Sequence, residues 1–311
     1  MILISDVANS PVGYAMLQLL SRRKEHALVR VLETYCGQLC RDDGFVPFAV
    51  PFYDQILLGN ALQGVDTLFL CSFNLFSDHR SFYVNILHEA AVSGVKKVVF
   101  VSSVGNSDSV SLPMKENRET EMCIRACGIP YIIFRVNIFM ENLPLLIGTN
   151  QASGIYYPAG NGRIAFVSVY DVADAIYPYV AGNVPAENRI FTLSHEITYS
   201  FKDIAVNLSQ YYARSVRYES ISLSFYRAIL SRMKIPQDTV DRLCSVAKAV
   251  SMNSYDVSDS TMRRILARHA QETQLGQRIR RWFSQKEVTP FLFGGQLTLL
   301  TDYLHGMHAR L

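Results

Sequence analysis

The turn after the first predicted strand carries the residues best placed to bind an anion. Met1–Ser5 is a buried-type strand and Val12–Arg22 has apolar residues at helical spacing, so a strand leads through a short turn into a helix. Backbone amides at the start of a helix can hold a phosphate group. In a dinucleotide-binding turn of this kind, one glycine permits the tight bend, a second lets the phosphates approach, and a third allows the helix to pack closely on the strand.

Only the third of these glycines is present here. The turn reads Asp6-Val7-Ala8-Asn9-Ser10-Pro11-Val12-Gly13. Val7 is β-branched and disfavours a positive φ, Ser10 adds a side chain where phosphates would approach, and Pro11 lacks an amide donor. Gly13, Ser10 and Asn9 are the candidate cofactor-binding residues of this turn, and both an intact and an eroded or lost site stay open.

Polar residues also follow two other predicted strands. Ser102 ends the strand Lys97–Ser102, at the carboxyl edge of the sheet and near where a nicotinamide would lie. A serine in this position can instead cap the loop that follows. Ser72 comes directly after the strand Thr67–Cys71 and would border the adenine or pyrophosphate, or would simply lie at the edge of the core.

Short apolar runs alternate with helical patterns through the first two hundred residues. Strands are expected at Met1–Ser5, Ala27–Val31, Thr67–Cys71, Lys97–Ser102 and Tyr131–Arg135, and helices at Val12–Arg22, Gln55–Leu62, Phe82–Ser93 and Glu116–Ala126. Uninterrupted apolar strands separated by helices predict a parallel sheet covered on both faces. The predicted fold class is α/β, a Rossmann-like doubly wound parallel sheet with a smaller, mostly helical C-terminal substrate or partner domain.

This pattern also suggests a division into domains. We expect a Rossmann-type NAD(P)-binding-like domain at 1–150 with a return segment at about 164–193, a mostly helical domain at 194–283, and a tail of unknown structure at 284–311. Within the helical part, Ser224–Phe283 is interrupted at Pro236 and near Asn253–Ser260. A further strand is expected at Ile164–Val169.

The composition is that of an ordinary folded chain. Of 311 residues, 49% are hydrophobic and 18% are charged, which excludes a disordered chain, and a net charge of +3 gives no general attraction to nucleic acid or membrane surfaces. No apolar run of about 18 residues occurs, and the N-terminus lacks the basic region of a signal peptide. The six cysteines and the histidines show no metal-ligand spacing. We therefore expect a cytoplasmic protein without a metal site.

Five segments together resemble one protein family. They are Ala61–Asp66 against ALxGVD, Asn85–Val95 with the strand after it against AAxxAGVKxxVYxS, Asn117–Glu121 against HxxTE, Gly128–Asn142 against GxPYTxLRxxxFxEN, and Gly160–Ala173 against GxGxxxxVxxxDxA. The chain thus resembles the NmrA-like branch of the atypical short-chain dehydrogenase/reductase superfamily, which includes NAD(P)H-dependent quinone and triphenylmethane reductases. The resemblance covers roughly residues 1–283 and implies a cofactor of the NADP or NAD type.

The chain departs from the family at the functional positions. Asn117 stands at the histidine of HxxTE, which is a lysine in sensor-type relatives, and Pro113 and Asn117 stand where the superfamily has its Tyr-xxx-Lys pair. Asn117 cannot act as a general acid or bring a charge to the ribose. Asn117 and Ser102 therefore occupy the family's catalytic region, but neither is a confident catalytic residue.

The resemblance also marks residues outside this region. Arg30, at the end of the second predicted strand, would meet the adenosine phosphate of NADP or would be an ordinary surface arginine. No acidic residue of the type that reads the ribose of NAD occurs at Leu28–Val31. Phe139, Glu141 and Asn142 resemble the family's substrate-cleft loop, although Glu141 could instead satisfy backbone amides.

Two functions follow from these observations. The first is a non-catalytic or cofactor-sensing regulatory or interaction protein with an eroded NAD(P) site, in which cofactor binding is weak or lost. The alternative is an NAD(P)H-dependent oxidoreductase that reduces quinone-like or aromatic acceptors. Such acceptors are already electrophilic, so they demand little beyond a positioned hydride donor.

One stretch of the C-terminal part is strongly basic. Thr261–Arg281 has one acidic residue, Glu272, against the arginines Arg263, Arg264, Arg268, Arg278, Arg280 and Arg281. This pattern indicates either a solvated helix face or a docking surface for an acidic partner or a phosphate backbone. We expect a protein partner or a homo-oligomer, no contact with a membrane, and no direct binding of nucleic acid.

Overall fold

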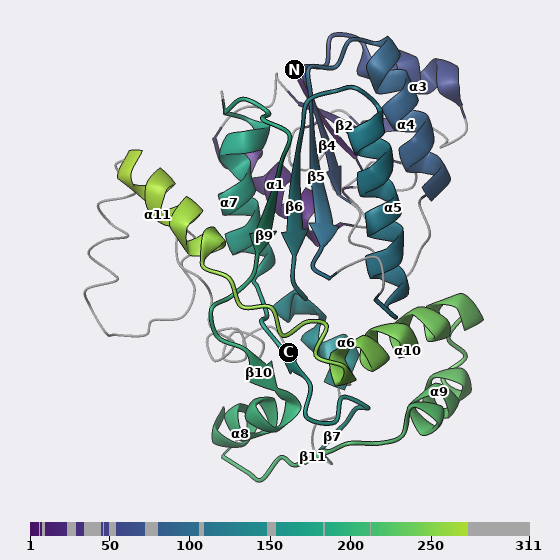
Figure 1. Ribbon diagram of the computed structural model, residues 1–311, viewed down its shortest axis with the longest axis vertical. Helices are drawn as coiled ribbons and strands as arrows, with labels where there is room; N and C mark the ends of the chain where they lie inside the picture. The colour runs from purple at the N-terminus through teal and green to yellow at the C-terminus, as the bar shows by residue number, and fades with distance from the viewer. Residues whose placement is uncertain are drawn as a thin grey trace. The chain divides into compact units, whose positions relative to one another are not determined.

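Figure 1 shows a computed structural model of the chain. The structure describes residues 1–272 apart from 6, 8–9, 24–28, 34–44, 46, 50–53, 72–79, 106–108, 148–153, 183 and 212. The site candidates Asn9 and Ser72, the arginines Arg278, Arg280 and Arg281, and the tail at 284–311 therefore lie outside the described residues. The chain forms two compact units that interleave along the sequence. The first contains the described residues of Met1–Ser103, Pro113–Arg135 and Ala173–Phe191, and the second contains those of Val104–Leu112, Val136–Val172 and the chain from Thr192 to Glu272. The continuous domains at 1–150 and 194–283 stay a prediction.

A seven-stranded sheet forms the centre of the first unit, with the strand order β3-β2-β1-β4-β5-β6-β9. The strands are β1 (Ile2–Ser5), β2 (Val29–Glu33), β3 (Pro47–Ala49), β4 (Thr67–Cys71), β5 (Lys97–Ser103), β6 (Tyr131–Val136) and β9 (Arg189–Leu193). The four pairs β1–β2, β1–β4, β2–β3 and β4–β5 are parallel. The strand order reverses its direction between β1 and β4, which confirms the doubly wound sheet.

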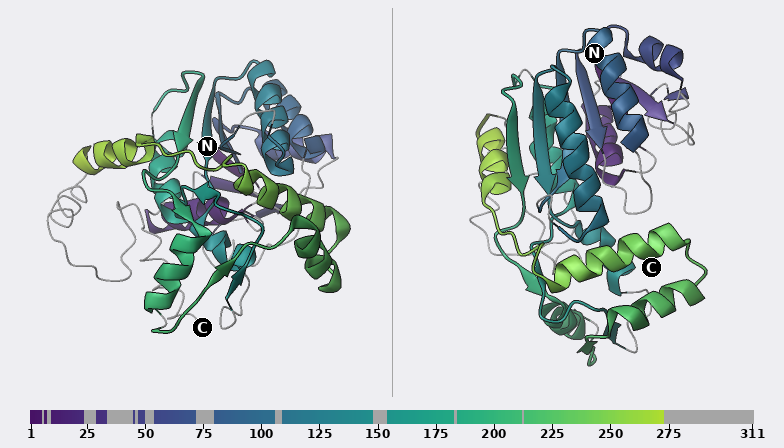
Figure 2. Two further views of the ribbon diagram at one scale, coloured as in Figure 1. Left: turned by 60° about the horizontal axis from the view of Figure 1, so that its bottom comes forward. Right: turned by 45° about the vertical axis from the view of Figure 1, so that its right-hand side comes forward.

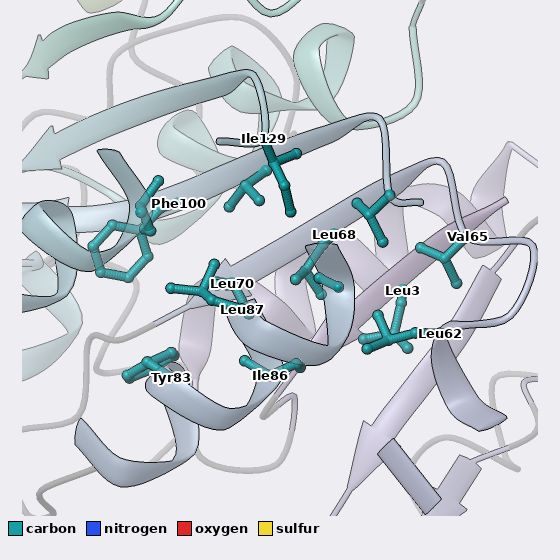
Figure 3. Close-up of a cluster of buried hydrophobic side chains, with 14 of the residues drawn as sticks. Leu3, Leu62, Val65, Leu68, Leu70, Tyr83, Ile86, Leu87, Phe100 and Ile129 are labelled. Carbon is teal, nitrogen blue, oxygen red and sulfur yellow. The ribbon is translucent and has the colours of Figure 1, made fainter. Parts of the chain in front are cut away.

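Helices cover both faces of this sheet (Figures 1 and 2). They are α1 (Pro11–Arg22), α3 (Gln55–Leu62), α4 (Arg80–Val92), α5 (Leu112–Ala126) and α7 (Val169–Val180). The first four residues of α7 belong to the second unit, and the helix belongs to the first unit from Ala173 onward. Apolar residues of α3, α4 and α5 form one core cluster with the sheet, and Figure 3 shows Leu68 and Ile86 within it. Ile133 of β6 belongs to the same cluster. The next residue of β6, Phe134, points to the opposite face, because side chains alternate along a strand. Its ring lies 5.1 Å from that of Tyr179 in α7.

The second unit has two small sheets and a set of short helices. Its elements are η2 (Met140–Asn142), α6 (Leu143–Ile147), β7 (Ile155–Tyr156), β8 (Arg163–Ile164), β10 (Tyr199–Ser200), α8 (Phe201–Tyr211), β11 (Tyr218–Glu219), α9 (Leu223–Arg232), α10 (Gln237–Ser251) and α11 (Thr261–Glu272). Strands β8 and β10 are antiparallel, and β7 and β11 are parallel. The fully buried ring of Tyr157 stacks on Phe201 at 4.6 Å and meets Tyr226 edge-on at 5.3 Å. The predicted helix breaks at Pro236 and near Asn253–Ser260 are confirmed.

Two predicted strands differ from the observed ones. The strand expected at Ile164–Val169 is reduced to β8, which is Arg163–Ile164, and the segment after it makes only a single parallel bridge between Phe139 and Val167. The second strand runs to Glu33 rather than to Val31. In the part of the chain that the structure describes, no helix is long and apolar enough to cross a membrane.

Candidate functional site

The candidate site lies at the carboxyl edge of the sheet in the first unit. The strand order reverses between β1 and β4, and in doubly wound folds ligands bind outside the carboxyl ends of the strands at such a switch point. Ser5 ends β1, and the turn into α1 follows it directly. Ser102 and Ser103 end β5 at the same edge. The topology therefore brings the predicted turn and the predicted serines to one edge of one sheet.

Ser10 caps the helix that follows the turn. It is the N-cap residue of α1, with an extended backbone, and its Oγ accepts a hydrogen bond from the Gly13 amide at 3.1 Å. Its carbonyl oxygen accepts the amide of Tyr14 at 2.9 Å. Pro11 is the first helical residue and has no N–H. Of the first three helical residues, Val12 alone keeps an amide that is not used in this cap.

Gly13 occupies the helix-packing position that the sequence assigned to it. A Cβ on Gly13 would lie 3.3 Å from both the Ser10 Cβ and the Val7 Cα, which is closer than an ordinary van der Waals contact. Val7 and Ser10 are both buried. Val7 and Ser10 therefore place buried side chains at two positions where a pyrophosphate-binding turn has glycine. These two residues do not fit a pyrophosphate in the manner of the glycine-rich turn.

A polar network joins the end of β5 to α5. The Ser102 hydroxyl donates to Glu121 Oε1 at 2.5 Å, and Asn117 Nδ2 donates to Ser103 Oγ at 3.0 Å. All four residues are buried. The structure thus brings Ser102 and Asn117 to one edge of the sheet, as the resemblance implies, but it commits their polar atoms to neighbouring side chains.

Two arginines share the Glu121 carboxylate. Arg135 Nε lies 3.1 Å from Oε1 and its Nη2 lies 2.7 Å from Oε2, while Arg118 pairs with Oε1 and also donates to the Ser103 carbonyl. The three side chains sum to one positive charge. Burial, and next the charge of Arg135, lower the pKa of Arg118 to about 9, and burial lowers the pKa of Arg135. The Nε of Arg118 is buried without a hydrogen-bond partner.

This network includes a residue that the sequence analysis did not single out. Glu121 and Arg135 fall in motifs of the resemblance, but Arg118 belongs to none of its motif letters. The spacing of three residues between Arg118 and Glu121 on a predicted helix was the available signal, because such residues are neighbours on a helix surface.

Arg30 is not at the carboxyl end of its strand, and that expectation is wrong. It is the second residue of β2, opposite Leu3, and the strand continues to Glu33. The Arg30 guanidinium donates to the carbonyl oxygens of Ala61 at 2.9 Å and Gln63 at 2.7 Å. The last residue of β2 is therefore Glu33. In dinucleotide-binding sheets an acidic residue at this position is typical of NAD binding rather than NADP binding.

The residues of the predicted cleft loop lie in the second unit. Glu141 accepts hydrogen bonds from the Val169 amide at 3.1 and 3.2 Å and from the Ser168 hydroxyl at 3.2 Å, so it caps the start of α7. Phe139 is fully buried, and its carbonyl accepts the Asn142 amide at 3.0 Å. Of the two roles left open for Glu141, satisfying backbone amides is the one that this geometry provides.

No group of three histidine, cysteine or acidic residues that could hold a metal occurs among residues with a described placement.

His195 is buried, and burial lowers its pKa. Its Nδ1 accepts the amide of Ile197 at 2.9 Å, so this nitrogen carries no proton in this geometry. The residue therefore has a structural role in the second unit.

The basic stretch begins on α11. Arg263 forms an ion pair with Glu196 at 2.9 Å, and Arg264 donates to the Thr261 hydroxyl at 2.9 Å. Both arginines are exposed. Arg268 lies on the same helix, and the other three arginines of the predicted docking surface fall outside the described residues.

Comparisons with known proteins agree with this architecture. The chain is 26% identical to quinone oxidoreductase 2 of Escherichia coli (strain K12) over 191 residues, which cover 61% of this chain and 66%, just under two thirds, of that protein. The crystal structure of the Escherichia coli NADPH-dependent quinone oxidoreductase with NADPH superposes with a TM-score of 0.81 at 18% identity, covering 99% of this chain and 100% of that one. The structure of NmrA, a negative transcriptional regulator in complex with NADP, superposes with a TM-score of 0.64 at 13% identity, covering 83% and 85%.

The family assignment rests on a longer match. The model of the NmrA-like family matches residues 21–273, which is most of the chain, and it begins after the turn that contains Val7, Ser10 and Gly13. By this match and by its fold, the chain belongs to the NmrA-like family.

Proposed function

We propose that this chain is a non-catalytic, regulatory or interaction protein built on the NmrA-like fold. The observation that carries this proposal is the bond from Asn117 to Ser103, at the position where relatives have a histidine or lysine. An asparagine amide neither gains nor loses a proton near neutral pH. The site therefore has no general acid at this point of α5.

The neighbouring groups do not replace it. Pro113 has no hydroxyl, and the Ser102 hydroxyl donates to the Glu121 carboxylate. Glu121 is in turn paired with two guanidinium groups, so its carboxylate oxygens are already engaged as acceptors. The network supports a role in holding β5, α5 and β6 together.

The fold itself is compatible with such a role. The solved NmrA structure is that of a negative transcriptional regulator in complex with NADP, so a protein of this fold can act as a regulator. At 13% identity this likeness concerns the fold alone. It supports the proposal as a precedent for the architecture.

A turnover assay tests the proposal. The purified chain at high concentration would be mixed with NADH or NADPH and a panel of quinones and azo or triphenylmethane dyes, and oxidation of the reduced cofactor would be followed by the loss of its absorbance. We expect no oxidation above buffer, whereas the Escherichia coli quinone oxidoreductase run in parallel should be active. Oxidation that rises in proportion to protein concentration would overturn the proposal.

A second candidate is an NAD(P)H-dependent oxidoreductase for quinone-like or aromatic acceptors. The observation that favours it is the 26% identity to quinone oxidoreductase 2, together with similarity over most of the chain to reductase structures. Electrophilic acceptors need little proton chemistry from the protein. The same assay separates the two candidates, because only the second one gives turnover.

We also propose that α11 contributes to a surface for an acidic protein partner or a second copy of the chain. Its exposed arginines, Arg263 and Arg264, support this proposal, although the ion pair with Glu196 offsets one of the charges. Sedimentation velocity at low and high salt would report self-association. If the R263E/R264E variant sediments like the wild type at every salt concentration, self-association through these arginines is wrong.

A further inference from the structure

We infer that Ser10 closes the pyrophosphate end of the family's coenzyme site by capping α1 with its own hydroxyl. The cap occupies the helix N-terminus at the position where the dinucleotide-binding turn has its second glycine. A phosphate that binds in the family's manner must displace this hydroxyl. The chain therefore binds NADH and NADPH weakly, and the Ser10 hydroxyl is the group that a bound phosphate would have to displace.

The donors of the first helical turn show why. The Gly13 amide donates a hydrogen bond to Ser10 Oγ at 3.1 Å, and the Tyr14 amide donates one to the Ser10 carbonyl oxygen at 2.9 Å. Pro11 has no amide to give. Among the first three helical residues, Val12 is the one whose amide this cap leaves unused, whereas a bound pyrophosphate uses several amides at a helix N-terminus.

The two turn residues with a described placement, Val7 and Ser10, are also closely packed. Ser10 is 2% exposed, and Val7, at the position of the first glycine, is 1% exposed. The helix approaches the turn so closely that even a methyl group on Gly13 would press on both residues at 3.3 Å. The hydroxyl cap and the close packing therefore exclude the phosphate from the same place.

This inference concerns binding and is independent of the proposed absence of turnover. A cofactor-sensing protein would bind a dinucleotide tightly without oxidising it, and such a result would overturn the inference while leaving the proposed function intact. Turnover by the wild type that needs a high cofactor concentration would overturn the proposed function and leave the inference of weak binding intact.

The test is a gain of binding. Calorimetric titration of the full-length protein with NADH and with NADPH would compare the wild type with Ser10→Gly and Ser10→Ala. We expect Ser10→Gly to tighten binding by at least about tenfold, the equivalent of one charge-assisted hydrogen bond. Ser10→Ala frees the Gly13 amide but keeps the Cβ, so its affinity should fall between the other two.

Ser222→Gly is the matched control. Ser222 caps α9 with the same chemistry, because its Oγ accepts the Phe225 amide at 3.2 Å. Losing that cap should leave the dinucleotide affinity unchanged. Circular dichroism would verify folding of each variant, and Ser10→Ala supplies the test if Ser10→Gly does not fold. A wild-type Kd in the low micromolar range, or folded Ser10 variants that bind no more tightly than the wild type, would overturn the inference.

Discussion

The two edges of the sheet each hold one carboxylate between two cations, but only one of these clusters is buried. At the amino edge, Asp66 lies 2.5 Å from the Met1 ammonium and 2.6 Å from Lys96 Nζ, and its side chain is 46% exposed. At the carboxyl edge, Glu121 lies between Arg118 and Arg135 with its side chain 4% exposed. Both carboxylates therefore lie between two cations, but water surrounds Asp66 and is largely excluded from Glu121.

This difference shows where the chain commits its polar groups. An exposed ion pair contributes little because water and salt screen it. A buried carboxylate that loses its partners leaves charge in a poorly solvated place, so the cluster must stay complete. The carboxyl edge, where the family's ligands bind, is thus fixed by internal bonds in this chain, both at Glu121 and at the Ser10 cap.

Glu121→Gln should have the largest effect. It leaves the buried Arg118 and the partly buried Arg135 without their shared carboxylate, so the free energy of unfolding should fall by about 3–5 kcal/mol. Urea denaturation followed by circular dichroism would measure it. Asp66→Asn is the control at the other edge, with an expected loss below about 1 kcal/mol. Equal losses in the two variants would contradict the contrast between the edges.

Gly13→Ala should have the next largest effect. The added methyl group presses on Ser10 and Val7, so we expect a loss of about 1–3 kcal/mol in the same denaturation experiment. Gly59→Ala in α3 provides the control, since its new Cβ would meet only Glu89 Oε2 at an ordinary 3.5 Å. Alanine should stabilise that helix by about 0.5–1 kcal/mol. A stabilised Gly13→Ala variant would show that the turn has more room than its packing indicates.

Ser10→Ala should cost about 1 kcal/mol, because α1 loses its hydroxyl cap. Thermal unfolding would measure this loss beside Ser10→Gly, for which we expect only a few tenths of a kcal/mol, since glycine is tolerated at an N-cap. A Ser10→Ala variant as stable as the wild type would mean that the cap contributes nothing to α1.

The smallest effect should be a pH dependence at the amino edge. Hydrogen bonding to Lys96 and the Met1 ammonium lowers the pKa of Asp66 from 3.8 to about 2. A lowered carboxyl pKa adds stability that is present above the unfolded value and is lost as pH falls through the folded value. The stability difference between the wild type and Asp66→Asn should therefore shrink between pH 3.8 and pH 2. A difference that stays constant over this window would contradict the pairing.

Much of the scaffold could be predicted because its signals are local. The apolar runs gave β4 at its observed bounds, Thr67–Cys71, and helical spacing gave α3 at Gln55–Leu62. Gly13 was recognisable as a packing glycine from its place in the turn. The end of β2 was missed because Leu32 and Glu33 lie next to residues without a strand pattern, and the pairing with β1 and β3 extends the strand through them.

The sequence by itself determined the doubly wound sheet, the missing glycines at Val7 and Ser10, and the family resemblance, because periodicity and motifs depend on neighbours along the chain. Only the tertiary structure decided which polar groups are satisfied. It paired Glu121 with Arg135 across two elements and directed Glu141 to the Val169 amide at the start of α7, 28 residues away. Such partners are chosen by how strands and helices pack, since burial makes an unpaired charge or amide costly wherever the fold places it.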